Sequence, residues 1–299
     1  MTDLRLDGRT YALAPGETVL DALLGHGVAV DNRCCNGVCL SCLMRCSDGE
    51  LPAPAQKGLR ETLRARGYFL ACQCRPRGDL SLERVDAAQL RSPARVVDKQ
   101  MIAADVCRLR LDTATPLYYH AGQFINLVHP GGGQRSYSLA SVPQTDPYLE
   151  LHVKRVPHGL ASGWIHDDLA CGDALMFEGP YGDAFYLPGR AQQPMLLIAT
   201  GTGLAPVLGV ARDALRDGHV GPVVLYHGSR FRTGHYATDS LAELARTHAN
   251  FEYHLCLSGE VGDAGDCEPA RSGRAGDLAL SDHRILKGWR GFICGNPTM

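Results

Sequence analysis

The sequence lacks an excess of charge of either sign. Its 299 residues include 30 lysines and arginines and 32 aspartates and glutamates, for a formal net charge of −2. Proteins that bind nucleic acid mainly through phosphate contacts carry a basic patch or stripe. The balance therefore excludes a nucleic-acid binder driven by phosphate charge.

The chain also shows no targeting segment and no convincing membrane span. Its first residues, MTDLRLDGRTYAL, lack a basic start followed by an apolar stretch, so no secretory signal is visible. The uncharged run 191–211 is long enough to span a membrane. However, Pro194, Pro206 and several glycines divide it into a short strand, a loop and the start of a helix. We therefore expect a cytoplasmic protein.

Two frequent catalytic motifs are missing as well. The 12 histidines form no H-E-x-x-H pair, and no G-x-S-x-G turn surrounds a nucleophilic serine. The sequence thus offers neither a pair of metal-binding histidines nor a hydrolase nucleophile. Each histidine is expected to be a surface residue or a hydrogen-bonded core residue.

Cysteine, in contrast, is abundant: the chain has 12, of which seven lie between Cys34 and Cys74. In the reducing cytoplasm, clustered cysteines bind metal or do redox chemistry more often than they form disulfides. Cys34, Cys39 and Cys42 follow the spacing C-x4-C-x2-C, and Cys72 comes after 29 further residues. This is the plant-type spacing of a [2Fe–2S] cluster held by four thiolates.

Other readings of these cysteines stay open from the spacing alone. A zinc site usually has two C-x2-C pairs, whereas this segment offers one in the right register. Buried free thiols are the simplest role for the spare Cys35, Cys46 and Cys74, although Cys74 competes with Cys72 for the fourth ligand position. Gly37 would let the loop backbone approach a cluster closely, so that loop amides could hydrogen-bond its sulfurs.

Residues 1–88 carry further features of a small redox domain. A hairpin is expected over 4–13, a helix begins near Glu17, and a strand over 68–72 follows the cysteine loop. The segment resembles a plant-type ferredoxin domain of β-grasp fold. The resemblance favours Cys72 as the fourth ligand, because the sequence from Cys72 to Pro76 matches the C-x3-P ending of that domain.

The rest of the chain divides into two segments with different patterns. Residues 93–188 alternate short apolar strands with Gly and Pro turns, which predicts an antiparallel β-barrel or sandwich. Residues 190–299 alternate strands and helices, which predicts an α/β parallel sheet with a ligand site at the carboxyl ends of its strands. The fold class is therefore multidomain α+β. The expected elements are strands 107–113, 124–129, 148–156, 174–180, 195–199, 223–227 and 251–257 and helices 205–216 and 239–248.

The motif R-x-Y-S-x-x-S begins at Arg135 in the all-β segment. Arginine offers a bidentate fork for a phosphate, Tyr137 an aromatic face, and Ser138 a hydroxyl near the end of a strand. This set suits a flavin with a phosphate tail, although an ordinary surface strand can look the same. Further along lie Lys154, the turn Gly159-Leu-Ala-Ser162 and the segment Gly179-Pro-Tyr-Gly182.

The α/β segment carries the run Thr200-Gly201-Thr202-Gly203-Leu204-Ala205-Pro206 between a strand and a helix. Its glycines allow close approach of a dinucleotide, the helix N-terminus favours phosphates, and proline suits the first helical turn. The run is not G-x-G-x-x-G, so a Rossmann dehydrogenase is the poorer match. The chain then ends in Cys294-Gly295-Asn296-Pro297-Thr298-Met299.

In this order, the motifs resemble the ferredoxin–NADP reductase superfamily with an N-terminal plant-type ferredoxin domain. The resemblance implies that Arg135 contacts the flavin phosphates, Tyr137 lies against the isoalloxazine, and Ser138 lies near flavin N5. It also implies that the turn from Gly159 to Ser162 holds the pyrophosphate, which favours FAD over FMN, and adds Lys154 to the cofactor-binding set.

For the nicotinamide nucleotide, the resemblance implies two further motifs. The family motif GTGxAP covers Gly201, Thr202, Gly203 and Pro206. The family motif CGxPxM covers Cys294, Gly295 and Pro297, with the cysteine beside the nicotinamide ring. Ser138 and Cys294 are accordingly the candidate catalytic residues.

The identity of the nucleotide is less defined. Ser229 and Arg230 resemble the ribose-binding edge of the family. Arg230, Arg232 and Tyr236 could hold a 2′-phosphate and so select NADPH, but relatives that use NADH also carry an arginine there. We favour NADH.

The resemblance predicts an oxidoreductase that passes electrons from NAD(P)H through FAD and a [2Fe–2S] cluster to a redox partner protein. The domain order is that of reductase components of bacterial multicomponent mono- and dioxygenases, and we expect a monomer. A dehydratase of deoxysugar biosynthesis is an alternative acceptor, and a non-catalytic iron–sulfur carrier or sensor is an alternative of another class. Relatives usually continue beyond the terminal motif with a helix and a final strand. The chain is therefore expected either to be truncated at Met299 or to lack a sheet edge.

Overall fold

The computed structural model describes residues 2–32, 34–38, 40–59, 61–85, 91–114, 117–259 and 270–296. The chain forms two compact units, one made of residues 1–91 and 181–183 and the other of residues 92–180 and 184–299. Each unit is described by itself. No helix among the described residues is long and apolar enough to cross a membrane.

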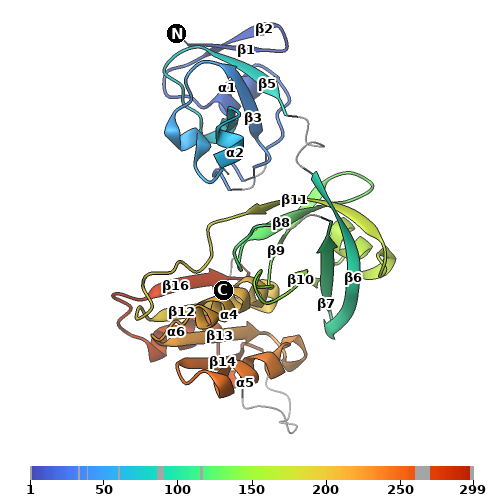
Figure 1. Ribbon diagram of the computed structural model, residues 1–299, viewed down its shortest axis with the longest axis vertical. Coiled ribbons are helices and arrows are strands. Elements are labelled where there is room, and N and C mark those ends of the chain that lie inside the picture. The colour runs from blue at the N-terminus through green and yellow to red at the C-terminus, as the bar shows by residue number, and fades with distance from the viewer. Residues whose placement is uncertain are drawn as a thin grey trace. The chain divides into compact units, whose positions relative to one another are not determined.

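The first unit is a five-stranded sheet with the strand order β2-β1-β5-β3-β4 (Figure 1). The predicted hairpin is confirmed, because β1 and β2 pair antiparallel in the register Leu4 to Tyr11. The predicted helix is α1, whose N-cap Thr18 accepts a hydrogen bond from the amide of Asp21 and so satisfies a free helical donor. The elements of this unit are β1 (Thr2–Leu6), β2 (Arg9–Leu13), α1 (Val19–Gly25), β3 (Leu43–Asp48), η1 (Ala53–Gln56), α2 (Glu61–Arg64), β4 (Tyr68–Leu70), η2 (Ala71–Gln73) and β5 (Leu80–Arg84).

The second unit begins with a barrel module, a six-stranded sheet in the order β10-β7-β6-β11-β8-β9. Leu139, which directly follows β9, forms a bridge with Leu151 in β10. The two outermost strands therefore meet, and the sheet closes as a barrel. Its elements are β6 (Arg91–Ala103), β7 (Val106–Thr113), β8 (Phe124–Val128), β9 (Gln134–Ser138), β10 (Leu149–Lys154), α3 (Leu160–Gly163), η4 (Trp164–Asp168) and β11 (Ala174–Tyr181).

An α/β module completes the second unit. Its parallel sheet has the order β15-β14-β13-β12-β16, as the alternation of strands and helices predicted. Helices α4 and α5 pack on one face of the sheet and α6 on the other. The elements are β12 (Met195–Thr200), η5 (Gly201–Gly203), α4 (Leu204–Arg216), β13 (Val223–Ser229), η6 (Arg232–Gly234), α5 (Thr238–Thr247), β14 (Phe251–Leu257), β15 (Arg271–Ser272), α6 (Ala275–Asp282) and β16 (Arg290–Cys294).

The barrel and α/β modules share apolar contacts. Ile102 and Ala103 at the end of β6 and Val106 at the start of β7 flank the turn between these strands, and all three pack into the core formed by α4, α5 and the sheet. A polar contact joins the modules elsewhere, since both terminal nitrogens of Arg212 in α4 bond the carboxylate of Asp146 at 2.8 and 2.9 Å. The two modules therefore form one structural unit.

Candidate functional site

Two of the predicted cluster ligands, Cys42 and Cys72, lie at one end of the first sheet. Cys42 directly precedes β3, Cys72 lies in η2 just after β4, and these two strands pair antiparallel. The Ala71 amide donates to the Cys42 carbonyl at 3.0 Å, which continues the pairing to the ligand positions. Gln73 then connects this end to the cysteine loop, because its side-chain nitrogen lies 3.3 Å from the Cys35 carbonyl.

The cysteine loop has the tight backbone that close wrapping requires. Cys35, Gly37 and Leu40 have φ values of 50°, 77° and 55°, in the left-handed region. The Asn36 amide donates to the Sγ of Cys34 at 3.4 Å, the kind of contact that stabilises charge on a thiolate or cluster sulfur. These thiols and amides are a donor set that fits an iron–sulfur cluster.

The complete ligand set nevertheless stays a prediction. Cys39 lies outside the described residues, and no group of three or more His, Cys, Asp or Glu side chains within the described ranges is placed to hold a metal ion. The side-chain nitrogen of Gln73 also lies 3.5 Å from the Sγ of Cys72. Cys74 is completely buried. These contacts favour Cys72 over Cys74 as the residue that faces the loop.

In the second unit, strands β9 and β10 form one wall of a pocket. The bridge between Leu139 and Leu151 fixes their antiparallel register, and one further step along it sets Ser138 opposite His152. Side chains two residues apart point to the same face of a strand. Ser136 and Lys154 therefore share this face, and all four of these polar residues line the pocket.

Tyr137 contributes an aromatic surface to the same wall. It lines the pocket and also packs against the barrel core, and burial raises the pKa of its phenol to about 12 despite the nearby Arg135. The ring is therefore uncharged at physiological pH. Arg135 itself is exposed on β9 and does not line the pocket.

The turn that begins at Gly159 is closed by its own serine. The Ser162 hydroxyl accepts from the Val156 amide at 3.1 Å and donates to the Gly159 carbonyl at 3.3 Å. A Cβ on Gly159 would lie 2.6 Å from that hydroxyl oxygen, so only glycine fits. The turn opens a short helix, α3, and the Ser162 hydroxyl holds the turn together from inside.

The opposite wall of the pocket is the carboxyl edge of the parallel sheet. β12 and β16 pair parallel with Ala199 beside Cys294, so the turn after β12 meets the end of β16. A Cβ on Gly203 would lie 2.0 Å from the Cys294 carbonyl oxygen, and one on Gly295 would lie 2.0 Å from the Thr200 hydroxyl oxygen. Both glycines are therefore required for the two backbones to cross.

The surroundings of Cys294 at this crossing determine its position and its protonation state. The Asn296 amide donates to the Thr200 hydroxyl at 2.9 Å and holds the end of the strand in place. Burial raises the pKa of the Cys294 thiol, so the side chain is an uncharged thiol and not a thiolate nucleophile. Pro206 lies buried in the first turn of α4, where its missing amide costs nothing.

The two walls enclose a pocket of about 800 Å³. Ten predicted site residues line it: Tyr137, Ser138, Lys154, Gly201, Thr202, Gly203, Ser229, Arg230, Cys294 and Gly295. Arg135, Gly159, Ser162 and Pro206 do not line it, and Pro297 lies outside the described residues. Five further lining residues lie within or beside the motifs quoted from the sequence: Ser136, Thr200, Ala205, Gly228 and Asn296. The sequence reasoning missed the other lining residues, which are His152, Ser258, Gly273, Arg274 and Ala275.

For some of the missed residues, the sequence did carry a feature that could have identified them. Ser258 directly follows the strand β14, and the carboxyl ends of parallel strands meet at one edge, so a polar residue there was a candidate. Arg274 precedes a helix that the sequence pattern did not predict. His152 carried no motif at all, because its position follows from the pairing of two strands that are distant in the sequence.

One expectation is wrong. Tyr236 was a candidate for a 2′-phosphate contact, but only 3% of its surface is exposed and its hydroxyl lies 3.2 Å from the Nδ1 of His152. The short helix η6 ends at Gly234, and Tyr236 turns into the core between the modules. Its hydroxyl is therefore not offered to a nucleotide.

Comparisons with known proteins agree with this architecture. Three protein families match consecutive parts of the chain: the 2Fe-2S iron-sulfur cluster binding domain over residues 4–77, the oxidoreductase FAD-binding domain over 93–186 and the oxidoreductase NAD-binding domain over 197–299. The matches follow the order of the three predicted modules.

Relatives similar over nearly the whole chain include reductase subunits and components. The chain is 40% identical to the aromatic O-demethylase reductase subunit of an Amycolatopsis species, covering 98% of this chain and 90% of the relative. It is 31% identical to the reductase component of the naphthalene 1,2-dioxygenase system of Pseudomonas putida, with coverages of 98% and 89%.

Among solved structures, the crystal structure of the Amycolatopsis cytochrome P450 reductase GcoB matches with a TM-score of 0.69 and 38% identity, covering 100% of this chain and 92% of that one. The match extends the sequence relationship to the fold. The chain therefore belongs to the ferredoxin–NAD(P)+ reductase family, as an iron–sulfur flavoprotein oxidoreductase that combines [2Fe–2S], FAD and NAD(P)H and transfers electrons between them.

Proposed function

We propose that this chain is the reductase component of an oxygenase system and delivers electrons from NADH to a separate oxygenase protein. The observation that carries the proposal is the pocket in the second unit. One of its walls carries Tyr137 and Ser138 of the barrel module, and the other carries the GTG turn and Cys294 of the α/β module. A flavin ring and a nicotinamide ring need such a shared space to react.

The residues of the pocket divide the work of holding two cofactors. Ser138 offers a hydroxyl to the flavin ring, and the uncharged Tyr137 offers an aromatic surface beside it. Arg135 would hold the flavin phosphates from the exposed side of β9. When bound, FAD supplies two-electron chemistry toward the nicotinamide and single-electron chemistry toward the iron–sulfur cluster.

On the α/β side, the backbone does most of the binding. The GTG turn leads into α4, and the N-terminus of a helix carries partial positive charge that attracts phosphate. Gly203 and Gly295 keep side chains out of the crossing, which leaves the Cys294 thiol at the pocket surface. Because the thiol is neutral, it can pack beside the uncharged ring of the reduced nicotinamide without the cost of removing a charge from water.

NADH is the preferred donor in this proposal. Ser229 and Arg230 line the pocket, and Lys154 and Arg274 add two more positive charges to its lining. The loss of Tyr236 from the candidate 2′-phosphate set removes one of the three groups that would select NADPH. Arg230 then acts on the ribose or the pyrophosphate of either nucleotide.

The identity of the electron acceptor is the part of the proposal that depends least on the residues of the pocket. The relatives named above are reductases, and the names of two of them place them beside an O-demethylase and a naphthalene dioxygenase. We propose that Cys34, Cys39, Cys42 and Cys72 hold the cluster from which an oxygenase component takes electrons one at a time. We further propose that the chain acts in the cytoplasm as a monomer.

Anaerobic titration of the purified holoprotein tests these assignments. The visible spectrum is recorded during addition of NADH and, separately, NADPH. Both flavin and cluster absorbance should bleach at lower NADH than NADPH concentrations. Cys72→Ser should abolish the cluster signal and leave flavin reduction intact, whereas Cys74→Ser should keep both.

Three results would contradict parts of the proposal. Absence of bleaching with either nucleotide would exclude the reductase function. Loss of the cluster in Cys74→Ser but not in Cys72→Ser would reverse the ligand choice. If the reduced protein transfers electrons to no oxygenase component, the proposed partner class is wrong.

A further inference from the structure

His152 occupies a central place in the pocket that no motif marks. It lies on β10, opposite Ser138 in the register fixed by the bridge between Leu139 and Leu151, and its side chain is 3% exposed. The little surface that it retains lines the pocket. A buried polar ring at such a site needs partners for both nitrogens.

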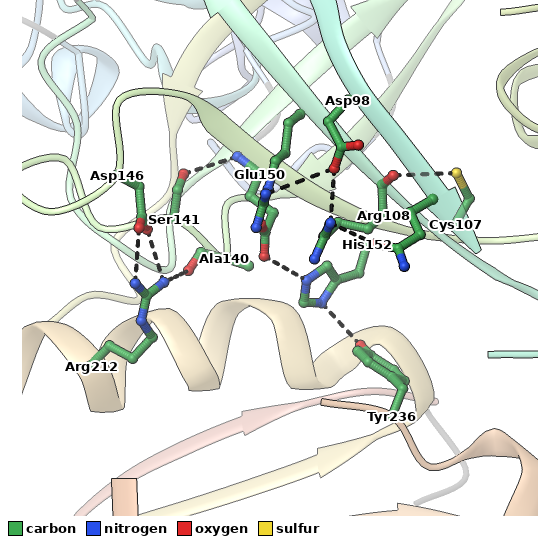
Figure 2. Close-up of polar contacts among 12 residues, drawn as sticks. Asp98, Cys107, Arg108, Ala140, Ser141, Asp146, Glu150, His152, Arg212 and Tyr236 are labelled. Carbon is green, nitrogen blue, oxygen red and sulfur yellow. Dashed lines mark hydrogen bonds and ion pairs between the residues drawn. The ribbon is translucent and has the colours of Figure 1, made fainter. Parts of the chain in front are cut away.

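Both ring nitrogens have a partner, one from each module. Nε2 lies 3.1 Å from Oε1 of Glu150 in the barrel, and Nδ1 lies 3.2 Å from the hydroxyl of Tyr236 in the α/β module. Figure 2 shows the imidazole between these two residues. Among the contacts of the described residues, His152 thus forms a polar link between the modules inside the pocket wall.

The chemistry of the two partners fixes the tautomer of the ring. Burial raises the pKa of Tyr236, so its hydroxyl keeps its proton and can donate it to Nδ1 of the neutral imidazole. Burial alone would raise the pKa of Glu150, but the hydrogen bonds from His152 and Arg110 lower it to about 2. The carboxylate is therefore ionised and accepts the proton carried by Nε2.

Each partner is itself anchored. The second carboxylate oxygen of Glu150 accepts from the Nε of Arg110 at 2.7 Å. On the other side, the ring of Tyr236 packs edge-on against His227, with ring centres 5.6 Å apart. The Nε2 of His227 lies 3.2 Å from the carbonyl oxygen of Gly201 in the GTG turn.

His227 extends the link to the nucleotide-binding turn. It is completely buried, and burial, followed by the neighbouring His235, lowers its pKa to about 3. The ring is therefore neutral, and its Nε2 proton donates to the Gly201 carbonyl. A continuous series of contacts thus runs from Glu150 through His152, Tyr236 and His227 to Gly201.

We propose that His152 is a positioning residue for the reaction between the two rings. Its two hydrogen bonds hold the Ser138 wall of the barrel at a fixed separation from the Cys294 and GTG wall. The inference rests on the proposed function, since it concerns the geometry in which nicotinamide and flavin meet. Small errors in such a geometry lower the rate of reaction more than they lower affinity.

The second contact between the modules provides a matched control. Arg212 and Asp146 also join α4 to the barrel with two hydrogen bonds (Figure 2), but neither residue lines the pocket. If any loss of contact between modules disturbs the reaction, both links should behave alike. If His152 positions the reacting wall, only its own link should affect the rate.

The test combines kinetics with a spectroscopic readout. Flavin reduction by NADH is followed in single turnovers for the wild-type holoprotein and for Tyr236→Phe, His152→Met, His152→Gln and Arg212→Met. Affinity for NAD+ and the thermal midpoint are measured in parallel. The ¹⁵N chemical shifts of histidine-labelled protein report the tautomer of His152, whose signal is assigned by its loss in His152→Gln.

The expected pattern separates rate from binding. Tyr236→Phe and His152→Met should lower the limiting rate of flavin reduction about tenfold and leave the NAD+ affinity within about twofold. His152→Gln should restore most of the rate, because its amide can donate to Glu150 and accept from Tyr236. Arg212→Met should lower the thermal midpoint without changing the limiting rate, and the spectrum should show His152 protonated on Nε2.

Three results would each overturn the inference. They are an unchanged limiting rate in Tyr236→Phe, a rate loss in Arg212→Met equal to that in Tyr236→Phe, and a proton on Nδ1 of His152. If His152→Met fails to retain FAD, Tyr236→Phe alone decides, because it removes a single oxygen. A wild-type protein that NADH does not reduce would instead contradict the proposed function.

Discussion

The cysteine loop and the pocket of the second unit are built in opposite ways. The loop gathers Cys34 and Cys42 within one short segment, and local left-handed turns at Cys35, Gly37 and Leu40 shape it. The pocket takes its walls from strands β9, β10, β12, β13 and β16, which span most of the second unit. The spacing of residues along the sequence identifies a local site, whereas the pocket depends on strand register and on the crossing of separate backbones.

If the pocket depends on backbone crossing, one added methyl group should break it. Gly203→Ala places a Cβ 2.0 Å from the Cys294 carbonyl oxygen, so either the GTG turn or the end of β16 must move. A misplacement of about 1 Å can cost about 100-fold in rate. We expect flavin reduction by NADH to slow by about 100-fold in single turnovers, with FAD and cluster content unchanged.

Gly276→Ala is the matched control, because a Cβ there meets nothing within 4 Å and the residue lies in the helix α6. Alanine should be neutral or stabilising at this position by about 0.5–1 kcal/mol. Equal rates for Gly203→Ala and wild type would show that the crossing does not control the nucleotide site.

The polar wall of the pocket should also depend on pH. The pKa of Glu150 is lowered from 4.5 to about 2 in the folded protein. The ionised carboxylate therefore stabilises the fold above pH 4.5, and this contribution is lost as the pH falls from 4.5 toward 2. Glu150→Gln should cost about 2–3 kcal/mol at pH 7, or about 5–10 °C in the midpoint of thermal FAD release.

The difference between Glu150→Gln and wild type should narrow progressively below pH 4.5. Asp167→Asn is the control, because Asp167 also pairs with an arginine, Arg155, but on the exposed surface, where such pairs contribute little. Its midpoint should match wild type at every pH. A pH-independent difference for Glu150→Gln would mean that its charge is not what stabilises the wall.

The smallest expected effect concerns the contact that joins the cysteine loop to Cys72. Gln73→Leu keeps the side-chain size but removes the amide that reaches the Cys35 carbonyl and the Cys72 sulfur. Loss of a donor to sulfur disfavours the added negative charge of a reduced cluster. The midpoint potential of the cluster should fall modestly in a spectroscopic redox titration, while the cluster is retained.

Gln56→Leu serves as the comparison in the same unit. Its amide donates to the Tyr68 carbonyl at 2.9 Å, so its loss should destabilise the unit without moving the potential. If the midpoint potential of Gln73→Leu is unchanged, the Gln73 amide contacts the backbone but does not influence the cluster.

The sequence predicted those parts of the molecule whose signal is local. The hairpin at the N-terminus, the helix capped by Thr18, and the GTG turn between a strand and a helix all follow from short-range patterns that the structure confirms. His152 and Tyr236 could not be placed in this way, because the contact between them joins residues 84 positions apart. Arg274 was missed because its helix, α6, has a weakly periodic sequence.

The turn between β6 and β7 has a consequence for recombination between related reductases. Ile102, Ala103 and Val106 belong to the barrel by sequence but to the core of the α/β module by packing. A chimera joined near residue 190 would therefore bring three apolar side chains from one parent against a core selected in the other. Hybrids that exchange the two modules together, with the turn and its core from the same parent, avoid that mismatch.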